Sequence, residues 1–344
     1  MTPFTFTGVA RALKPLTLAT AFGAAMIAAP SVAQEAVTLR VASFIPAQGF
    51  LNVAVVQPYL AKVEADSKGT LKFDFFPGGT LGRAPAQQLS LVQSGATDIA
   101  VVLPAYTPGA FEEYNVTQLP NIAKTTAAAS VGAWEAFDQG LLPAPEGVKI
   151  LGVVTTAQNI MHTKTPVTTL DDLAGLKIRA AGSIQSSAVE KLGGAVIGNI
   201  SGPEIAEGLS RNLLDGTLMD WVGIREFRVD RLAENHLEVD FGRLALILPI
   251  NQKSFDKLPQ AAKDALINNG GRVYAQAGGQ AFDDAIDSYR SEYLADGHTA
   301  VSFSAQDTAT VDAALKDVVA EWVGEGENRQ AVLDAFAAGA MSAK

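Results

Sequence analysis

Arg179 is the residue whose surroundings in the sequence best suit binding chemistry. It ends the strand-like segment LKIR at 176–179, in which alternation places Ile178 on the face opposite Arg179. Small residues and a predicted helix start follow at 180–183, and ligands of open α/β sheets bind just outside the carboxyl ends of strands. A planar guanidinium matches both oxygens of a carboxylate, and helix N–H groups favour an anion. The position therefore predicts a carboxylate site, with a surface arginine paired to a nearby Asp or Glu as the alternative.

The sequence carries little of the chemistry that catalysis needs. It has no cysteine, no G-x-S-x-G or H-E-x-x-H motif, and no glycine-rich phosphate loop. Its three histidines, His162, His236 and His298, lie in separate segments. We expect each at the surface or at a helix cap rather than as a metal ligand or general base. An exported α/β enzyme is the alternative, because acid and base residues need not be close in sequence, but a binding function without catalysis is favoured.

Residues 1–33 predict a secretory signal peptide. Arg11 and Lys14 precede the apolar run LTLATAFGAAMIAAP, and SVA forms a small-x-small cleavage site that ends at Ala33. The run is shorter than the roughly 20 residues of a spanning helix, so we expect a soluble mature chain that begins near Gln34 and is either secreted outright or held in a periplasm. The formal net charge of −10 argues against nucleic acid or an anionic membrane surface as partner. We expect a monomer.

Strands and helices alternate on both sides of Arg179. The N-terminal part predicts the order β-α-β-α-β, with elements at 37–44, 58–67, 71–79, 84–95 and 97–106. This order is typical of a parallel sheet buried on both faces. A similar order recurs from residue 176 and ends in a strand predicted at 216–224. The sequence therefore predicts two similar α/β lobes, each a mostly parallel sheet flanked by helices.

Two extended segments, 147–156 and 244–255, connect the predicted lobes and form a hinge that allows closure around a ligand. The predicted lobe boundaries are 36–156 plus 245–284 for lobe 1, and 157–244 plus 285–344 for lobe 2. The last third is predicted to be helical. Its segment 259–297 forms either one very long helix or two helices that break at Gly270 and Gly271 or at Gly278 and Gly279.

Seven segments between about residues 37 and 290 carry a family likeness, in the order LRVASF, FPGGTLG, LVQSGATDIAVVLPAYTPGAF, PVTTLDDLAGLKIRAAG, PEIAEGL, LDGTLMDW and NQKSFDKLP. In this succession the chain resembles the substrate-binding subunit of tripartite ATP-independent periplasmic (TRAP) transporters, the DctP type. The resemblance implies a two-lobed periplasmic binding protein fold with hinge strands and a long C-terminal helix. It also implies that the protein closes on an organic acid and delivers it to the small and large TRAP membrane subunits.

The resemblance also implies roles for particular residues. Arg179 matches the family's carboxylate-binding arginine. Phe44, Tyr106 and Trp221 match places that face the cleft in the family, and an ordinary core or rim aromatic is the alternative for each. Gln88, near a helix start that faces the crevice, is a further candidate for ligand binding.

The chain departs from the family's pattern at several of these places. Ala110 stands where many relatives have a basic residue, Gln158 and Asn159 stand where many sugar-acid binders have a second arginine, and Met219 stands where Thr or Asn is frequent. The last three are candidate ligand contacts. A pocket with so few polar groups would leave the hydroxyls of a sugar acid unpaired, at roughly 1 to 3 kcal/mol each. We therefore expect a small monocarboxylate with an apolar or aromatic body.

One subclass of the family bridges its acid through a metal ion held by a glutamine and by an acidic residue just before a tryptophan. Gln158 and Asp220, before Trp221, would fit that arrangement, but the spacing in LDGTLMDW is closer to that of the metal-free relatives. We therefore predict no metal and no cofactor. A solute receptor of an ATP-driven importer, or a sensor's ligand-presenting subunit, is the alternative function.

Overall fold

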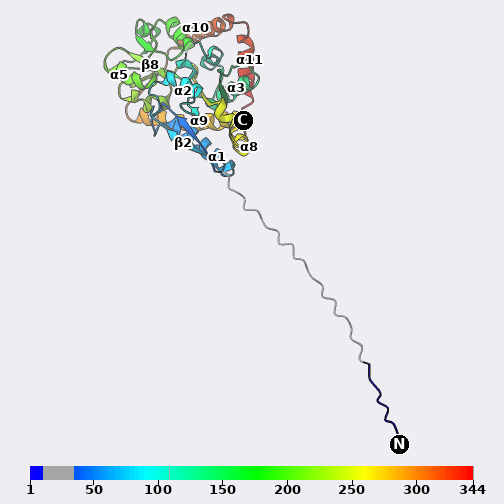
Figure 1. Ribbon diagram of the computed structural model, residues 1–344. Coiled ribbons are helices and arrows are strands. Elements are labelled where there is room, and N and C mark those ends of the chain that lie inside the picture. The colour runs from blue at the N-terminus through cyan, green and yellow to red at the C-terminus, as the bar shows by residue number, and fades with distance from the viewer. Residues whose placement is uncertain (11–34, 108, 344) are drawn as a thin grey trace. The chain divides into compact units, whose positions relative to one another are not determined.

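A computed structural model describes residues 1–10, 35–107 and 109–343 of the chain. The chain divides into two units, Met1–Gln34 and Glu35–Lys344, and all helices and strands described below belong to the second (Figure 1). The apolar run and the cleavage site of the predicted signal peptide lie outside the described residues. None of the helices found in the described residues is both long enough and apolar enough to cross a membrane.

The first sheet has the strand order β2-β1-β3-β10-β4. Its strands are β1 (Val37–Ala42), β2 (Leu71–Phe76), β3 (Ile99–Ala100), β4 (Val148–Thr155) and β10 (Ala245–Asn251). β1 pairs in parallel with β2 and β3, whereas β10 runs antiparallel to β3 and β4. The strand predicted at 97–106 is much shorter than expected: after β3 the structure describes only a single bridge, from Val102 to Ile247, and the 3-10 helix η3 (Pro104–Tyr106) begins at Pro104, which has no N–H for a ladder.

The second sheet has the strand order β11-β9-β5-β8-β6-β7. Its strands are β5 (Ile160–Thr163), β6 (Lys177–Arg179), β7 (Ala195–Ile197), β8 (Gly216–Met219), β9 (Asn235–Leu237) and β11 (Thr299–Val301). β6 is parallel to β7 and β8, and β5 is antiparallel to β8 and β9. The predicted two-lobed α/β class is confirmed, with mixed sheets, because strands that enter from the other lobe run against their neighbours.

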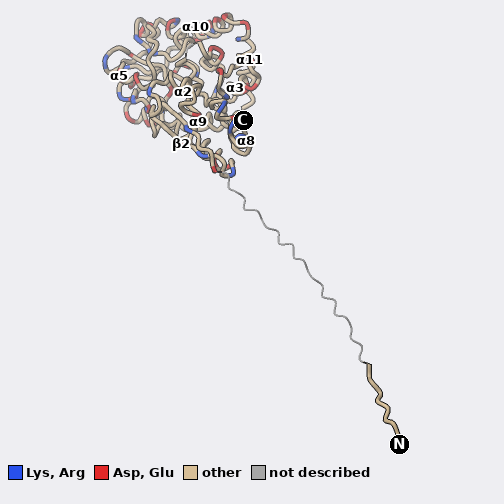
Figure 2. Tube along the Cα trace, in the orientation of Figure 1, with Lys and Arg blue, Asp and Glu red and all other residues tan. Residues whose placement is uncertain are grey.

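Helices flank both sheets. They are α1 (Gln57–Asp66), which continues the π-helix η1 (Leu51–Val56), α2 (Gln88–Ser94), α3 (Thr126–Asp138), α4 (Ser183–Lys191), α5 (Ile205–Ser210), α6 (Trp221–Glu226), α7 (Gln252–Asp256), α8 (Gln260–Asn269), α9 (Gly271–Ala295), α10 (Ala305–Gly324) and α11 (Arg329–Met341). Short 3-10 helices include η4 (Glu112–Gln118) and η6 (Gly202–Glu204). Figure 2 shows acidic and basic residues interspersed along the outer elements.

The predicted helical segment 259–297 breaks at the first of the two glycine pairs. Gly270 has an extended backbone, with φ −82° and ψ −160°, and ends α8. A Cβ on Gly270 would lie 2.4 Å from the carbonyl oxygen of Leu151 in β4, so this turn requires glycine. α9 then continues through Gly279, where a Cβ would lie 2.5 Å from the Ala127 Cα, so glycine permits the close packing of α9 on the start of α3.

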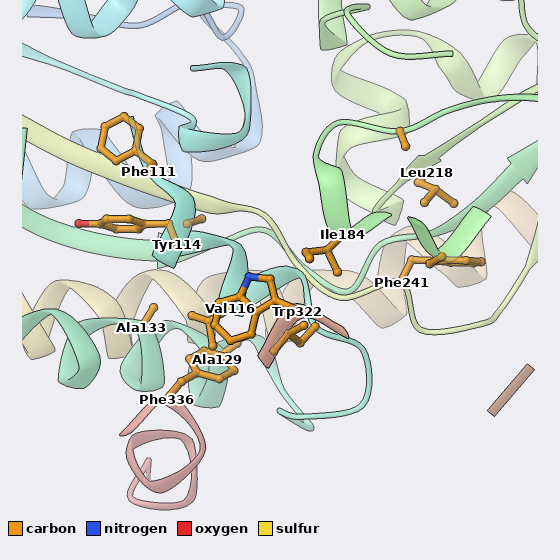
Figure 3. Close-up of a cluster of buried hydrophobic side chains, with 14 of the residues drawn as sticks. Phe111, Tyr114, Val116, Ala129, Ala133, Ile184, Leu218, Phe241, Trp322 and Phe336 are labelled. Carbon is orange, nitrogen blue, oxygen red and sulfur yellow. The ribbon is translucent and has the colours of Figure 1, made fainter. Parts of the chain in front are cut away.

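A hydrophobic cluster joins elements from both sheets. Figure 3 shows Phe111 and Tyr114 of the first lobe, Ile184 and Leu218 of the second, and Trp322 of α10 within it. α11 packs beside α3 (Figure 1), although residues 285–344 are predicted as part of lobe 2. The two sheets follow the predicted division of the chain, and the boundaries of the lobes themselves stay a prediction.

Candidate functional site

Arg179 ends β6 and is buried, with 1% of its surface exposed. Its Nε donates to the Ile200 carbonyl at 2.8 Å, Nη1 to the Leu218 carbonyl at 3.4 Å, and Nη2 to the Tyr106 hydroxyl at 2.9 Å. Within the described residues no carboxylate forms a salt bridge with it. The alternative of a paired surface arginine is therefore wrong.

Tyr106 connects the two lobes at this point. It lies in η3, which follows β3 of the first sheet, and its hydroxyl accepts hydrogen bonds from Arg179 Nη2 and from the Gly202 N–H, each at 2.9 Å. The centre of the Tyr106 ring lies 5.8 Å from the guanidinium carbon of Arg179, and the Phe44 ring packs edge to face on the Tyr106 ring with 6.2 Å between the ring centres. Tyr106 therefore accepts one of the hydrogen bonds that the guanidinium can donate, and it connects the first sheet to the second.

Arg179 lines a small cavity between the lobes, which we call the inner cavity, of about 60 Å³. It gathers five of the eight predicted ligand-binding residues, namely Phe44, Tyr106, Asn159, Arg179 and Met219. Most of its remaining lining is apolar, from Ile45, Leu51, Leu103, Val222, Phe227, Leu244, Leu246 and Phe282. Thr156, Asp220 and Glu226 add polar groups. A buried cation thus faces a space with mostly apolar walls.

A larger cleft of about 720 Å³, the outer cleft, shares Tyr106 with the inner cavity. Its lining includes Ala181, Gly182 and Ser183, the helix start predicted to seat a carboxylate. Arg179 lines the inner cavity, so the guanidinium and the helix start face different spaces. Tyr106 lines both spaces.

The other three predicted residues lie away from the inner cavity. Gln88 is buried, and its Nε2 donates to the carbonyls of Gly82 at 2.7 Å and Ala84 at 3.4 Å. Gln158 lines two outer hollows near Glu238. Trp221 is turned away because the strand predicted at 216–224 ends at Met219, and Asp220 then caps α6 by accepting from the Val222 and Gly223 N–H groups.

The structure therefore separates the two residues of the metal alternative. Gln158 lines the outer hollows and Asp220 lines the inner cavity. Among the described residues, no group of three or more His, Cys, Asp or Glu side chains is placed to hold a metal ion.

The sequence did not predict that the carboxyl groups of Asp220 and Glu226 line the inner cavity as candidate ligand contacts. Burial raises the pKa of Asp220 to about 6, and burial together with the charge of Asp220 raises the pKa of Glu226 to about 7. Glu226 Oε1 accepts from the Leu51 N–H at 3.2 Å, at the start of the first lobe's helix η1. Asp220 could have been proposed as a ligand contact because it is the acidic residue directly before Trp221. Nothing in the local sequence indicates a role for Glu226.

The expected surface or capping position is wrong for His162 and His236, and the three histidines form a hydrogen-bonded series. His162 and His236 are fully buried, and their Nδ1 atoms are 2.7 Å apart. His162 Nε2 lies 3.0 Å from the Met219 carbonyl, which can only accept, so this nitrogen carries the hydrogen. With neutral rings, His236 Nδ1 then donates to His162, and His298 Nδ1 donates to His236 Nε2 at 2.9 Å. The last hydrogen bond of this series is to Met219, which lines the inner cavity.

These buried imidazoles predict a pH dependence of stability. Burial holds the pKa values of His162 and His236 well below the ordinary value of about 6.5. Below that pH the unfolded chain binds more protons than the folded chain, so this stability is present above about pH 6.5 and is lost as pH falls. Each histidine contributes a slope that approaches about 1.4 kcal/mol per pH unit.

We expect the His236→Gln variant to lose free energy of unfolding less steeply than the wild type between pH 6.5 and 5, by about 1 kcal/mol per pH unit. Urea unfolding at several pH values measures this. The raised pKa values of Asp220 and Glu226 act in the opposite direction, stabilising the fold as pH falls, but they contribute to both proteins and cancel in the difference. Above pH 7.5 the two curves should be parallel. Parallel curves at every pH would contradict the neutral buried chain.

Comparison with known proteins gives consistent matches. The model of the DctP family, described as bacterial extracellular solute-binding protein, family 7, matches residues 46–325. A solute-binding protein of Albidiferax ferrireducens is 26% identical over 247 residues, 70% of this chain and 72% of the relative. A marine metagenome TRAP solute-binding protein specific for aromatic acids, solved with 3-hydroxybenzoate, superposes with a TM-score of 0.84 at 26% identity, covering 90% and 99% of the two chains. A TRAP solute-binding protein of Rhodoferax ferrireducens, solved with benzoate, shares the fold with a TM-score of 0.82 at 24% identity, over 89% and 98%.

Proposed function

The chain belongs to the DctP family of bacterial extracellular solute-binding proteins, and from this premise we propose that it captures a small aromatic or apolar monocarboxylate at Arg179 and delivers it to TRAP membrane subunits. The family match favours this function over the alternative of an ATP-driven importer or a sensor. We further propose that the chain is exported with cleavage near Ala33, acts as a monomer in the periplasm, and releases its ligand chemically unchanged.

The observation that carries the proposal is a buried arginine without an anionic partner. Arg179 is 1% exposed and hydrogen-bonds only neutral oxygens among the described residues. A buried charge that lacks its partner is unfavourable by roughly 3 to 5 kcal/mol. A ligand carboxylate supplies that partner and takes the place of the weaker neutral contact to Tyr106.

Ligand binding requires the lobes to separate from the arrangement described here. The inner cavity has about 60 Å³, whereas ligand pockets commonly have roughly 300 to 1,000 Å³. The contact between Tyr106 of the first lobe and Gly202 of the second would open with the lobes. We propose that the acid enters from the outer cleft and that Tyr106 closes behind it.

The lining of the inner cavity supports the ligand class. Phe44, Leu246 and Phe282 offer apolar surface, and Met219 adds a thioether. The hydroxyls of a sugar acid would meet few partners there, at roughly 1 to 3 kcal/mol for each one left unpaired. The aromatic acids bound by the marine relative are of the class proposed.

A thermal-shift screen of residues 34–344 against organic acids tests this function. An acid present at 100 times its dissociation constant adds roughly 2.7 kcal/mol of stability, so the melting temperature should rise by several degrees for aromatic monocarboxylates. The protein is first unfolded and refolded to remove any ligand carried through purification. Shifts produced only by sugar acids, neutral sugars or amino acids would contradict the proposal. Repeating the screen with EDTA should leave the ligand-induced rise in melting temperature unchanged. Loss of that rise would favour the alternative in which a metal ion bridges the acid.

A further inference from the structure

We infer that the bound acid also carries a hydrogen-bond donor, a hydroxyl or ammonium group, which Asp220 and Glu226 accept inside the inner cavity. This inference rests on the proposed function and narrows its ligand class. It concerns two carboxyl groups that share a cavity with Arg179 but form no ion pair with it or with any other described cation.

Asp220 supplies the first free acceptor. Its side chain is buried, with 4% of the residue exposed, and it lines the inner cavity. Oδ1 accepts from the N–H groups of Val222 at 2.9 Å and Gly223 at 3.0 Å, which fixes the carboxylate at the start of α6. The N–H of Asp220 itself also favours the charged form, and no described side chain donates to Oδ2. The carboxylate is therefore anchored through Oδ1 by backbone groups, and no side chain occupies Oδ2.

Glu226 supplies the second acceptor, at the other end of α6. It lies four residues after Val222 and three after Gly223, a spacing that puts it on the same helix face as both, and all three line the inner cavity. Its Oε1 accepts from the Leu51 N–H of the first lobe at 3.2 Å. The Phe50 N–H also donates to this carboxylate, and no described side chain donates to it. Glu226 is thus held at the junction of the lobes by backbone N–H groups, without a cation beside it.

Asn159 and Thr156, two of the polar side chains in the wall of the inner cavity, use their donors internally, so a ligand with its own donor supplies what they do not. Asn159 Nδ2 donates to Thr156 Oγ1 at 3.0 Å and to the Ala157 carbonyl at 3.1 Å, and Thr156 Oγ1 donates to the same carbonyl at 2.9 Å. The other walls are largely apolar. Buried acceptors left without a donor are unfavourable. A ligand with a hydroxyl or ammonium group therefore gains binding free energy that an unsubstituted aromatic acid does not.

The test compares matched ligands on matched variants by titration calorimetry at pH 7.5. The ligands are benzoate, the three hydroxybenzoate isomers, their methoxy counterparts, which keep the oxygen but lose the donor, and the aminomethylbenzoates for the ammonium case. We expect at least one donor-bearing isomer to bind wild type at least tenfold more tightly than benzoate and than its methoxy counterpart. In Glu226→Gln and Asp220→Asn that preference, taken as the ratio of the two affinities within the same variant, should fall to less than threefold.

Glu207→Gln is the control for removal of a carboxylate, since Glu207 pairs with Arg211 on the exposed surface outside the inner cavity. It should keep the wild-type preference. Equal binding of benzoate and every donor-bearing acid, or an unchanged preference in both cavity variants, would overturn this inference while leaving the proposed function intact. A lack of binding by every acid, unsubstituted benzoate included, would overturn both. Should Asp220→Asn fail to fold because it caps α6, Glu226→Gln alone decides the question.

Discussion

Replacing Arg179 by methionine should weaken binding of the cognate acid by more than 100-fold. Methionine keeps much of the side chain's length but removes the charge, so the ligand carboxylate would enter a buried, mostly apolar cavity without a partner. That loss is roughly 3 to 5 kcal/mol, and every 1.4 kcal/mol corresponds to about a tenfold change in affinity. Titration calorimetry with the best acid from the screen measures it.

Two further variants separate charge from geometry and from general effects. Arg179→Lys keeps the charge but loses the planar fork that matches two carboxylate oxygens, so it should bind with intermediate affinity. Arg211→Met removes an exposed arginine and should bind like wild type. Thermal melts of the free proteins check folding, because Arg179 Nε also holds the Ile200 carbonyl. A loss below about fivefold in Arg179→Met would remove this residue from the centre of the mechanism.

Replacing Gly242 by alanine should destabilise the fold by about 3 kcal/mol or more. Gly242 has φ +71°, and a Cβ there would lie 2.0 Å from the Gln118 carbonyl oxygen, which is backbone and cannot swing aside. Its own carbonyl accepts from the Asn159 N–H at 2.8 Å. The substitution therefore strains the segment that leads from the second sheet into β10, next to a residue that lines the inner cavity.

Gly140→Ala is the matched control for Gly242→Ala. Gly140 has φ +76°, but nothing lies within 4 Å of the position a Cβ would take. It should therefore show only the strain of the left-handed backbone, about 1 to 2 kcal/mol. Urea unfolding measures both, and similar losses would mean that the close approach to Gln118 contributes nothing. The difference between the two variants isolates the packing of the crossing segment.

Much of the fold could be predicted from the alternation of strands and helices and from the two segments that connect the lobes. Predictions failed where a single residue ended an element. Pro104 starts a 3-10 helix within the strand predicted at 97–106, and Asp220 caps α6 within the strand predicted at 216–224. The break of the long helix at Gly270 was one of several open alternatives, and its contact with the Leu151 carbonyl decides it.

The candidate site was predictable where it depends on one strand end and less so where it depends on tertiary packing. Arg179 follows from its place at the end of β6. Glu226 is held at the inner cavity by a hydrogen bond from the Leu51 N–H, which is 175 residues away in sequence. The histidine chain depends on the pairing of β5 with β9, which sets His162 directly opposite His236, and local sequence does not report that register.

The most direct test of the central claim is a crystal structure of residues 34–344 with the acid that gives the largest thermal shift. We predict both carboxylate oxygens within about 3 Å of Arg179 Nη1 and Nη2, in an enlarged inner cavity. The Tyr106 hydroxyl should no longer hold Nη2 alone. An acid seated in the outer cleft at the start of α4, with Arg179 still bonded only to Ile200, Leu218 and Tyr106, would contradict the account.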